Sequence, residues 1–394
     1  MAADDAITNE QEYILQTYGR PEFVLDRGEG VYLFDTEGRR YLDCVAGIAV
    51  NALGYGDKDV ERAIAQHAGG LIHTSNLYHT RPAGELAKLL VEHSFADRVF
   101  FSNSGAEAIE GAIKFARKYA RERHGEGKTT LVAFSGSFHG RTMGAVALTH
   151  REKYRQPFMP VMPDVRFAPF NDLRAAEAAI TDDVCAVVVE PIQGEGGLSV
   201  ATPEFLRGLR ARCDAVGALL ILDEIQCGMG RTGTLWAHEP YGVRPDIMTV
   251  AKPLGGGLPI GAVLLTQAVA DTLHAGEHGT TFGGGPLVTS VAQVVFQKIA
   301  TPGFLAHVRE VGDYFDEALH DFAATTPRVI ELRGRGLMRG IQIDGSAATV
   351  REAGHGAGIL MATAGDDVLR LLPPLIFERK HVDEAIEKLG QALR

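Results

Sequence analysis

Between about residues 98 and 266, short apolar runs alternate with segments of helical periodicity, and no other feature limits the possible folds of this chain so strongly. Residues 203–218, for example, carry apolar side chains at helical spacing and predict a helix that connects a strand at Val187 to a strand at Ile221. The alternation predicts an α/β fold, with a mostly parallel central sheet between helices on both faces. The predicted strands are RVFFS, TTLVAF, CAVVVEP, ALLILDE, DIMTVA and GAVLLT.

The remainder of the chain indicates a second, smaller unit. The chain has 394 residues, more than a single core of ordinary size contains. After about residue 286 the pattern changes to long amphipathic helices, such as FLAHVREVGDYFDEALHDF, around short strands. We therefore expect a large domain at residues 53–286, a smaller α+β domain at residues 287–394, and an N-terminal segment, residues 1–52, that contributes to the smaller domain.

Charge and composition exclude several classes of partner. The net charge of −11 disfavours nucleic acid and anionic membranes, because both attract clustered Lys and Arg. The four cysteines are far apart in the sequence, which favours a reducing, cytoplasmic setting. The first residues, MAADDAITNEQEYILQ, lack the basic and apolar regions of a secretory signal, and no stretch reaches the roughly 18 consecutive apolar residues of a membrane span.

Two charged residues stand where predicted strands end. Ligands of an open parallel sheet bind at the carboxyl ends of its strands, so Asp223, after LLIL, and Lys252, after DIMTVA, are candidates for a site. A lone lysine before a glycine-rich turn is usually a surface residue, but a buried aspartate needs a partner. Together the pair satisfies two needs of pyridoxal phosphate: an amine for a Schiff base and an anion for the pyridine nitrogen. Gln226 is placed to hydrogen-bond the phenolic oxygen of that ring.

Two further strand ends add to this set. The segment FFSNSGAEA runs from a strand into a helix near Gly105, so the free N–H groups of Gly105 and Ala106 form a candidate phosphate site. The segment FSGSFHGRT offers Phe138 as a flat face for the ring and Arg141 as a clamp for a carboxylate. Taken singly, such residues are more often ordinary packing or surface ion pairs, and only their combination points to a cofactor.

At this point the sequence resembles a known family, the class III pyridoxal-phosphate aminotransferases, and within it most closely the acetylornithine aminotransferases. The resemblance covers nearly the whole chain, from LFDTEGRRYLDCVAGIAVNALGYG to LRLLPPLIF. It implies the aminotransferase fold of type I and pyridoxal 5′-phosphate as the cofactor of the large domain. The motifs that carry it, in order, are NSGAEA, SFHGRT, VVVEPIQGEGG, LILDEIQCGMGRTG, AKPLGGGLPIGA and HGTTFGGGPL.

The family pattern implies a role for each cofactor residue. It makes Lys252 the Schiff-base lysine, Asp223 the partner of the pyridine nitrogen, and Phe138 the stacking ring. It makes Gly105 and Ala106 the phosphate cup.

The same pattern implies a homodimer with shared active sites, because it places Thr281 on the phosphate of the neighbouring subunit's cofactor. One departure is visible in that loop. Members of the family often carry Asn where this chain has Gly285, before Pro286.

The resemblance also implies a reaction. This is transfer of the terminal amino group of N2-acetylornithine to 2-oxoglutarate, giving N-acetylglutamate 5-semialdehyde and glutamate, in arginine biosynthesis. Arg141 would hold the donor's α-carboxylate and then the distal carboxylate of the acceptor. Glu195 would cover Arg370 until the keto acid arrives. Ile48 stands where ornithine-specific members carry a tyrosine for the free α-amine, and an apolar residue there favours an acylated nitrogen.

Other functions remain open at this stage. Succinylornithine, N-succinyl-diaminopimelate or a carrier-linked lysine would react by the same chemistry. An aminomutase would move the amine within one molecule and would need no 2-oxoglutarate. A regulatory protein that only keeps the fold is disfavoured by the intact Lys252 and Asp223.

Two further motifs are not assigned a function. HAGEH at residues 274–278 matches a metalloprotease pattern, but Gly276 interrupts the helix that such a site needs. We expect no metal site. The run RGRGLMRG has the wrong glycine spacing for a nucleotide loop and predicts a turn between strands.

Overall fold

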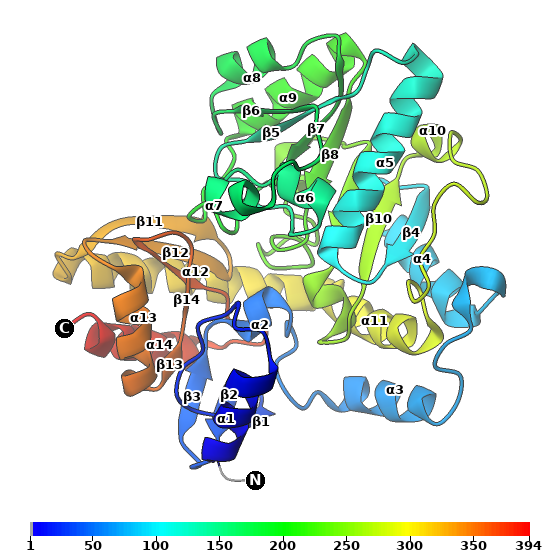
Figure 1. Cartoon of the computed structure of the whole chain (residues 1–394). Coiled ribbons are helices and arrows are strands. Elements are labelled where there is room, and N and C mark those ends of the chain that lie inside the picture. Colours follow the sequence, from blue (N-terminus) through cyan, green and yellow to red (C-terminus); the bar gives the residue numbers. More distant parts are fainter. Residues whose placement is uncertain (1–2) are drawn as a thin grey trace.

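The computed structural model describes residues 3–394, and within this range the strands form three sheets (Figure 1). The largest is a seven-stranded sheet in the order β4-β10-β9-β8-β7-β5-β6. All of its strands run in the same direction except β10, which is antiparallel to both of its neighbours. The mostly parallel central sheet is therefore confirmed. Its strands are β4 (Arg98–Ser102), β5 (Thr130–Phe134), β6 (Val165–Ala168), β7 (Val184–Val189), β8 (Leu219–Asp223), β9 (Ile247–Val250) and β10 (Gly261–Leu265).

Strand alternation distributes the apolar side chains over both faces of this sheet. In β5, Leu131 and Ala133 belong to the cluster around helix α5 (Gly105–His124), whereas Val132 and Phe134 belong to the cluster around α9 (Pro203–Val216). Each residue of a strand points to the opposite face from the next, so a continuous apolar run fits a sheet that is covered twice. The other helices of this region are α3 (Lys58–Ala68), α4 (Arg81–Glu92), α6 (Met143–Ala147), α7 (Glu152–Arg155), α8 (Leu173–Ala179), α10 (Gln267–Ala270) and α11 (Pro286–Ile299).

The N-terminal and C-terminal parts of the chain share a second sheet. Strand β13 pairs in parallel with β3, with Leu42 opposite Ile359, so the sheet has the order β1-β2-β3-β13. A third sheet, β11-β12-β15-β14, contains the predicted turn of RGRGLMRG between β11 and β12. The elements are α1 (Ala3–Tyr13), β1 (Leu25–Glu29), β2 (Tyr32–Asp35), β3 (Arg40–Asp43), α2 (Ala46–Ala49), α12 (Pro302–Thr325), β11 (Val329–Arg335), β12 (Met338–Ile343), α13 (Ala347–Ala357), β13 (Ile359–Leu360), β14 (Ala362–Thr363), β15 (Val368–Leu371) and α14 (Arg379–Ala392).

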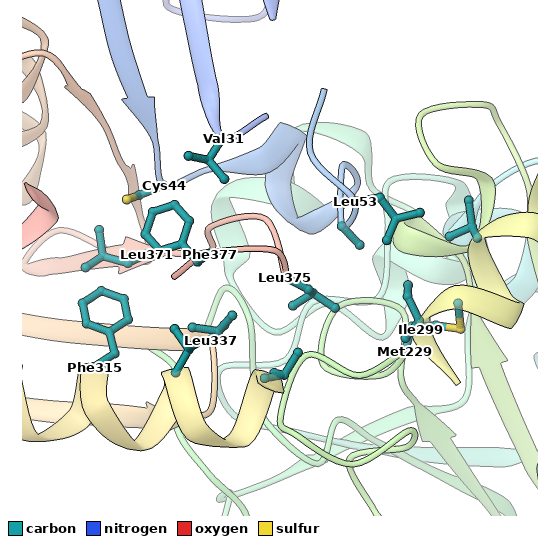
Figure 2. Packing of buried hydrophobic residues seen from close by; sticks show 14 of the residues in the cluster. Val31, Cys44, Leu53, Met229, Ile299, Phe315, Leu337, Leu371, Leu375 and Phe377 are labelled. Carbon is teal, nitrogen blue, oxygen red and sulfur yellow. The ribbon is translucent and has the colours of Figure 1, made fainter. Parts of the chain in front are cut away.

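One apolar cluster joins these sheets to the large domain's edge. Figure 2 shows Cys44, which follows β3, near Leu371 of β15 and Phe315 of α12. The same cluster includes Met248 of β9 and Ile299 of α11. The core therefore continues from the central sheet into the part built from both ends of the chain. No helix within residues 3–394 combines the length and apolar character needed to cross a bilayer.

Candidate active site

A cavity of 460 Å³ lies where the central strands end. Because β4, β5, β7, β8 and β9 run in parallel, the segments that follow all of them emerge at the same edge of the sheet. The sequence-predicted residues that line this cavity are Gly105, Ala106, Phe138, Arg141, Glu195, Asp223, Gln226 and Lys252. Residues from distant parts of the chain thus meet around one space.

Asp223, the last residue of β8, is buried and fully engaged. Its carboxylate accepts hydrogen bonds from His139 Nδ1 at 2.7 Å, from the Ile225 N–H at 3.0 Å and from the Thr249 hydroxyl at 3.3 Å. Burial alone would lower the pKa of His139, but the hydrogen bond and charge of Asp223 outweigh it and raise that pKa. The Asp223 carboxylate is therefore held in a fixed position at the cavity wall.

Lys252 lies just after β9, at the start of a short 3₁₀ turn that begins the glycine-rich loop. Its ammonium group has no hydrogen-bond partner within residues 3–394 and lines the cavity. Burial lowers the pKa of Lys252, the nearby Asp223 carboxylate opposes this shift, and the Arg370 guanidinium adds to it. An amine with a lowered pKa is a better nucleophile at neutral pH.

The start of α5 provides an anion site. Ser104 caps this helix by accepting the N–H of Glu107, so the N–H groups of Gly105 and Ala106 remain without an intrahelical partner. A side chain at position 105 would meet Ile225 at 2.9 Å, which is why a glycine is needed for this close approach. The helix dipole adds positive potential at the same point. The pair is suited to a phosphate group.

Arg141 is the open cation of the cavity. Its guanidinium lies 3.8 Å from the centre of the Tyr154 ring and 5.5 Å from the centre of the Phe138 ring. It forms no ion pair within the described part of the chain and is exposed to solvent. Arg141 is therefore available to a carboxylate from outside.

Arg370, in contrast, is covered. It is only 3 % exposed, and its Nη1 donates to Glu195 Oε1 at 2.5 Å, to the Gly194 carbonyl at 3.1 Å and to Gln226 Oε1 at 3.3 Å. The guanidinium of Arg370 is already paired with Glu195, so it is not free to bind a substrate carboxylate. Arg370 thus stands behind the cavity wall, held by residues that line it.

Besides Arg370, two more predicted residues, Thr281 and Ile48, lie outside this cavity, and Gly285 affects the start of a helix. Thr281 does not line it and is exposed on the loop before α11. Ile48, 41 % exposed, lies in the left-handed turn of α2, two residues before Val50, which does line the cavity. Gly285 is the N-cap of α11, so this helix starts without the side-chain cap that an Asn would provide.

Two polar residues of the site, His139 and Glu190, are not among those predicted from the sequence. His139 directly follows Phe138 and binds Asp223. Glu190 directly follows β7, lines the cavity and accepts the N–H groups of Phe138 at 3.1 Å and Gly194 at 3.0 Å. Burial raises the pKa of Glu190 to about 7, although the charge of His139 opposes the shift. The strand-end rule that selected Asp223 applies equally to Glu190.

The HAGEH motif is held against α5 by polar contacts. It lies in a loop in which Glu277 pairs with Lys118 and His278 Nδ1 contacts Lys114 at 2.8 Å, both on α5. Within the described residues no cluster of His, Cys, Asp or Glu could hold a metal ion.

The donor set of the cavity fits a flat, anionic ring that carries an aldehyde. An unpartnered amine, a buried carboxylate, free helix N–H groups and an aromatic face surround one space, and these are the groups that pyridoxal phosphate requires.

Comparison with known proteins gives the same chemistry. The profile of the family "Aminotransferase class-III" matches residues 13–393. The mitochondrial acetylornithine aminotransferase of Alnus glutinosa is 54 % identical over 96 % of this chain and 85 % of its own length. The succinylornithine transaminase of Salmonella enteritidis is 45 % identical over 98 % of this chain and 95 % of its own. The crystal structure of N-acetylornithine aminotransferase from Stenotrophomonas maltophilia superposes with a TM-score of 0.85, at 39 % identity and 98 % coverage of both chains.

Proposed function

Since this chain belongs to the class III aminotransferases, which use pyridoxal phosphate, we propose that it transfers the terminal amino group of N2-acetylornithine to 2-oxoglutarate. The products are N-acetylglutamate 5-semialdehyde and glutamate. The observation that carries the proposal is the pair of arginines around Lys252: Arg141 open to solvent and Arg370 covered by Glu195.

The residues at the strand ends perform the chemistry common to the family. When bound, the cofactor supplies an aldehyde that takes up the amine and a ring that accepts electrons from the substrate carbon. Lys252 Nζ, deprotonated more easily because of its burial, anchors the cofactor and then carries protons to and from the substrate. Asp223 keeps the ring nitrogen protonated, and His139 holds the carboxylate in place for this.

The two arginines select the substrates. A donor with one carboxylate finds only Arg141 free, so its far, terminal amine would lie toward the aldehyde carbon of the cofactor that Lys252 would hold. A dicarboxylate such as 2-oxoglutarate displaces Glu195 and binds Arg370 as well, with its distal carboxylate on Arg141. The apolar Ile48 near the cavity favours an acylated, uncharged nitrogen over the charged α-amine of free ornithine.

We further propose a homodimer in which Thr281 reaches the partner's cofactor. An exposed apolar surface supports this: Leu77 is 81 % exposed and Phe282 is 64 % exposed, next to Thr281. Asn76 ties the two segments together by donating to the Gly283 carbonyl at 3.0 Å. A surface of this kind commonly marks a protein interface.

The remaining assignments follow from the same proposal. The reaction belongs to arginine biosynthesis, in the cytoplasm. Residues 53–286 form the cofactor domain, and residues 1–52 join residues 287–394, as the pairing of β3 with β13 supports.

The donor itself is tested by comparing N2-acetylornithine, N2-succinylornithine and free ornithine at equal concentrations with 2-oxoglutarate. We expect kcat/KM to be highest for acetylornithine and at least tenfold lower for ornithine. Succinylornithine is the second candidate, because the Salmonella relative that acts on it is 45 % identical. Ornithine as the best donor would contradict the argument from Ile48, and turnover without 2-oxoglutarate would indicate an aminomutase.

A further inference from the structure

The carboxamide of Gln226 connects the covered arginine to the cofactor cavity. Gln226 is 7 % exposed and lines the cavity, and its Oε1 accepts a hydrogen bond from Arg370 Nη1 at 3.3 Å. Its Nε2 has no hydrogen-bond partner within residues 3–394. One end of the amide is thus bound to the arginine and the other is left without a protein partner.

The chemistry of Arg370 determines which end of the Gln226 amide faces the arginine. A guanidinium has only donors, whereas an amide has an acceptor at oxygen and donors at nitrogen, so only the oxygen of Gln226 can face Arg370. The two N–H groups of Nε2 therefore face the cavity. Without Arg370, nothing in these contacts would prevent the amide from turning its oxygen to the cavity.

The amide of Gln226 packs directly against Gly194. A Cβ atom at Gly194 would lie 2.4 Å from Gln226 Oε1, 2.5 Å from its Cδ and 2.6 Å from its Nε2, so the amide lies flat against the glycine. The carbonyl of the same residue accepts from Arg370 at 3.1 Å, and its N–H donates to Glu190 at 3.0 Å. The arginine and the amide are thus held on one peptide unit.

We propose that Arg370, besides binding a carboxylate, orients Gln226 so that its amide nitrogen donates to the phenolic oxygen of the cofactor. Arg370 is then a positioning residue that acts through Gln226 in the resting enzyme, before any substrate binds. The inference rests on the cofactor site proposed above and is independent of the identity of the donor.

The consequence is a change in the pKa of the Schiff-base nitrogen that would join Lys252 to the cofactor. This nitrogen is the link between the protein and the cofactor. A donated N–H stabilises the ionised phenolic oxygen most when the neighbouring nitrogen has lost its proton, because that proton otherwise neutralises the oxygen. Correct orientation of Gln226 therefore lowers the pKa of the link. A hydrogen bond to a charged group corresponds to a shift of roughly one pKa unit.

The test is the pH titration of cofactor absorbance in the substrate-free holoenzyme. Arg370→Met, which removes every donor, and Gln226→Ala should each raise the pKa of the link by about one unit. Gly194→Ala keeps both polar groups and displaces the amide, so it should give the same shift even if Arg370→Met folds poorly. Arg141→Met is the control for charge alone, because Arg141 lines the same cavity without touching Gln226. Its loss can act on the link only through space, so its shift should be smaller than that of Gln226→Ala.

A double variant separates orientation from direct charge effects. If Arg370 acts through the amide, adding Arg370→Met to Gln226→Ala should produce no further shift. A full further shift in that background, or an unshifted single variant Arg370→Met, would overturn the inference. A wild-type protein without any cofactor absorption band would overturn the cofactor site itself and this inference with it.

Discussion

Replacing Asp223 by Asn should abolish most of the catalytic rate while preserving the fold. Asn keeps an oxygen that can accept the N–H of Ile225 at 3.0 Å and the hydroxyl of Thr249 at 3.3 Å. It loses the charge and the 2.7 Å hydrogen bond from His139. The pKa of His139, raised by that carboxylate, should then fall.

The magnitude follows from the lost charge. Two unit charges about 4 Å apart, at an effective dielectric constant of about 20, interact by about 4 kcal/mol. If this attraction keeps the ring nitrogen protonated, its loss corresponds to roughly a thousandfold in kcat, at about 1.4 kcal/mol for each factor of ten. The cost to stability should be smaller, about 1.5–3 kcal/mol, the value of one charge-assisted hydrogen bond.

The assay measures kcat at saturating cofactor, cofactor affinity by absorbance, and unfolding by denaturant. Asp246→Asn is the matched control. Asp246 lies at the amino ends of the strands, away from the cavity, and accepts hydrogen bonds from the Arg210 guanidinium and the Leu220 N–H, both at 2.7 Å. That variant should lose stability and keep kcat. A kcat for Asp223→Asn within tenfold of wild type, or a larger loss in cofactor affinity than in kcat, would refute the reasoning.

Three other changes test separate parts of the site. Glu195→Ala uncovers Arg370 and should raise the single-turnover rate with glutamate relative to acetylornithine; equal proportional losses would mean that Glu195 does not gate Arg370. Thr281→Val should weaken cofactor affinity several-fold in the dimer although Thr281 lies outside its own chain's cavity, and an unchanged affinity would argue against shared sites. Burial raises the pKa of Glu190 to about 7, so the folded state binds this proton more tightly than the unfolded state does. The free energy of unfolding should therefore fall as pH rises from about 4.5 to about 7. Denaturant titrations at several pH values should show that Glu190→Gln removes this fall, and an unchanged pH dependence would contradict it.

That Asp223, Lys252 and Gly105 lie around one cavity could be predicted, because strand ends are local features of a sequence. A buried apolar run such as LLIL delivers the next residue, Asp223, to the edge of the sheet whatever the rest of the chain does. The start of α5 at Gly105 was visible in the same way. Strand β6 was missed, because VRFA is four residues long and carries an arginine.

Contacts between distant segments could not be predicted from local sequence patterns. The hydrogen bond between His139 and Asp223 joins residues 84 positions apart. The left-handed turn at Ala46–Ala49, which carries Ile48, has positive φ at residues with side chains, and no propensity predicts that. The Asp43 carboxylate supports the turn locally, by accepting the N–H groups of Val45 and Ala46, two and three residues further along the chain.

The most direct test of the whole account is the identity of the lysine that holds the cofactor. Borohydride reduction of the holoenzyme, followed by peptide mapping, should place the cofactor label on Lys252, and Lys252→Ala should bind the cofactor without a covalent link and show no turnover. A label on a different lysine, or substantial turnover by Lys252→Ala, would contradict the assignment on which the proposed function depends.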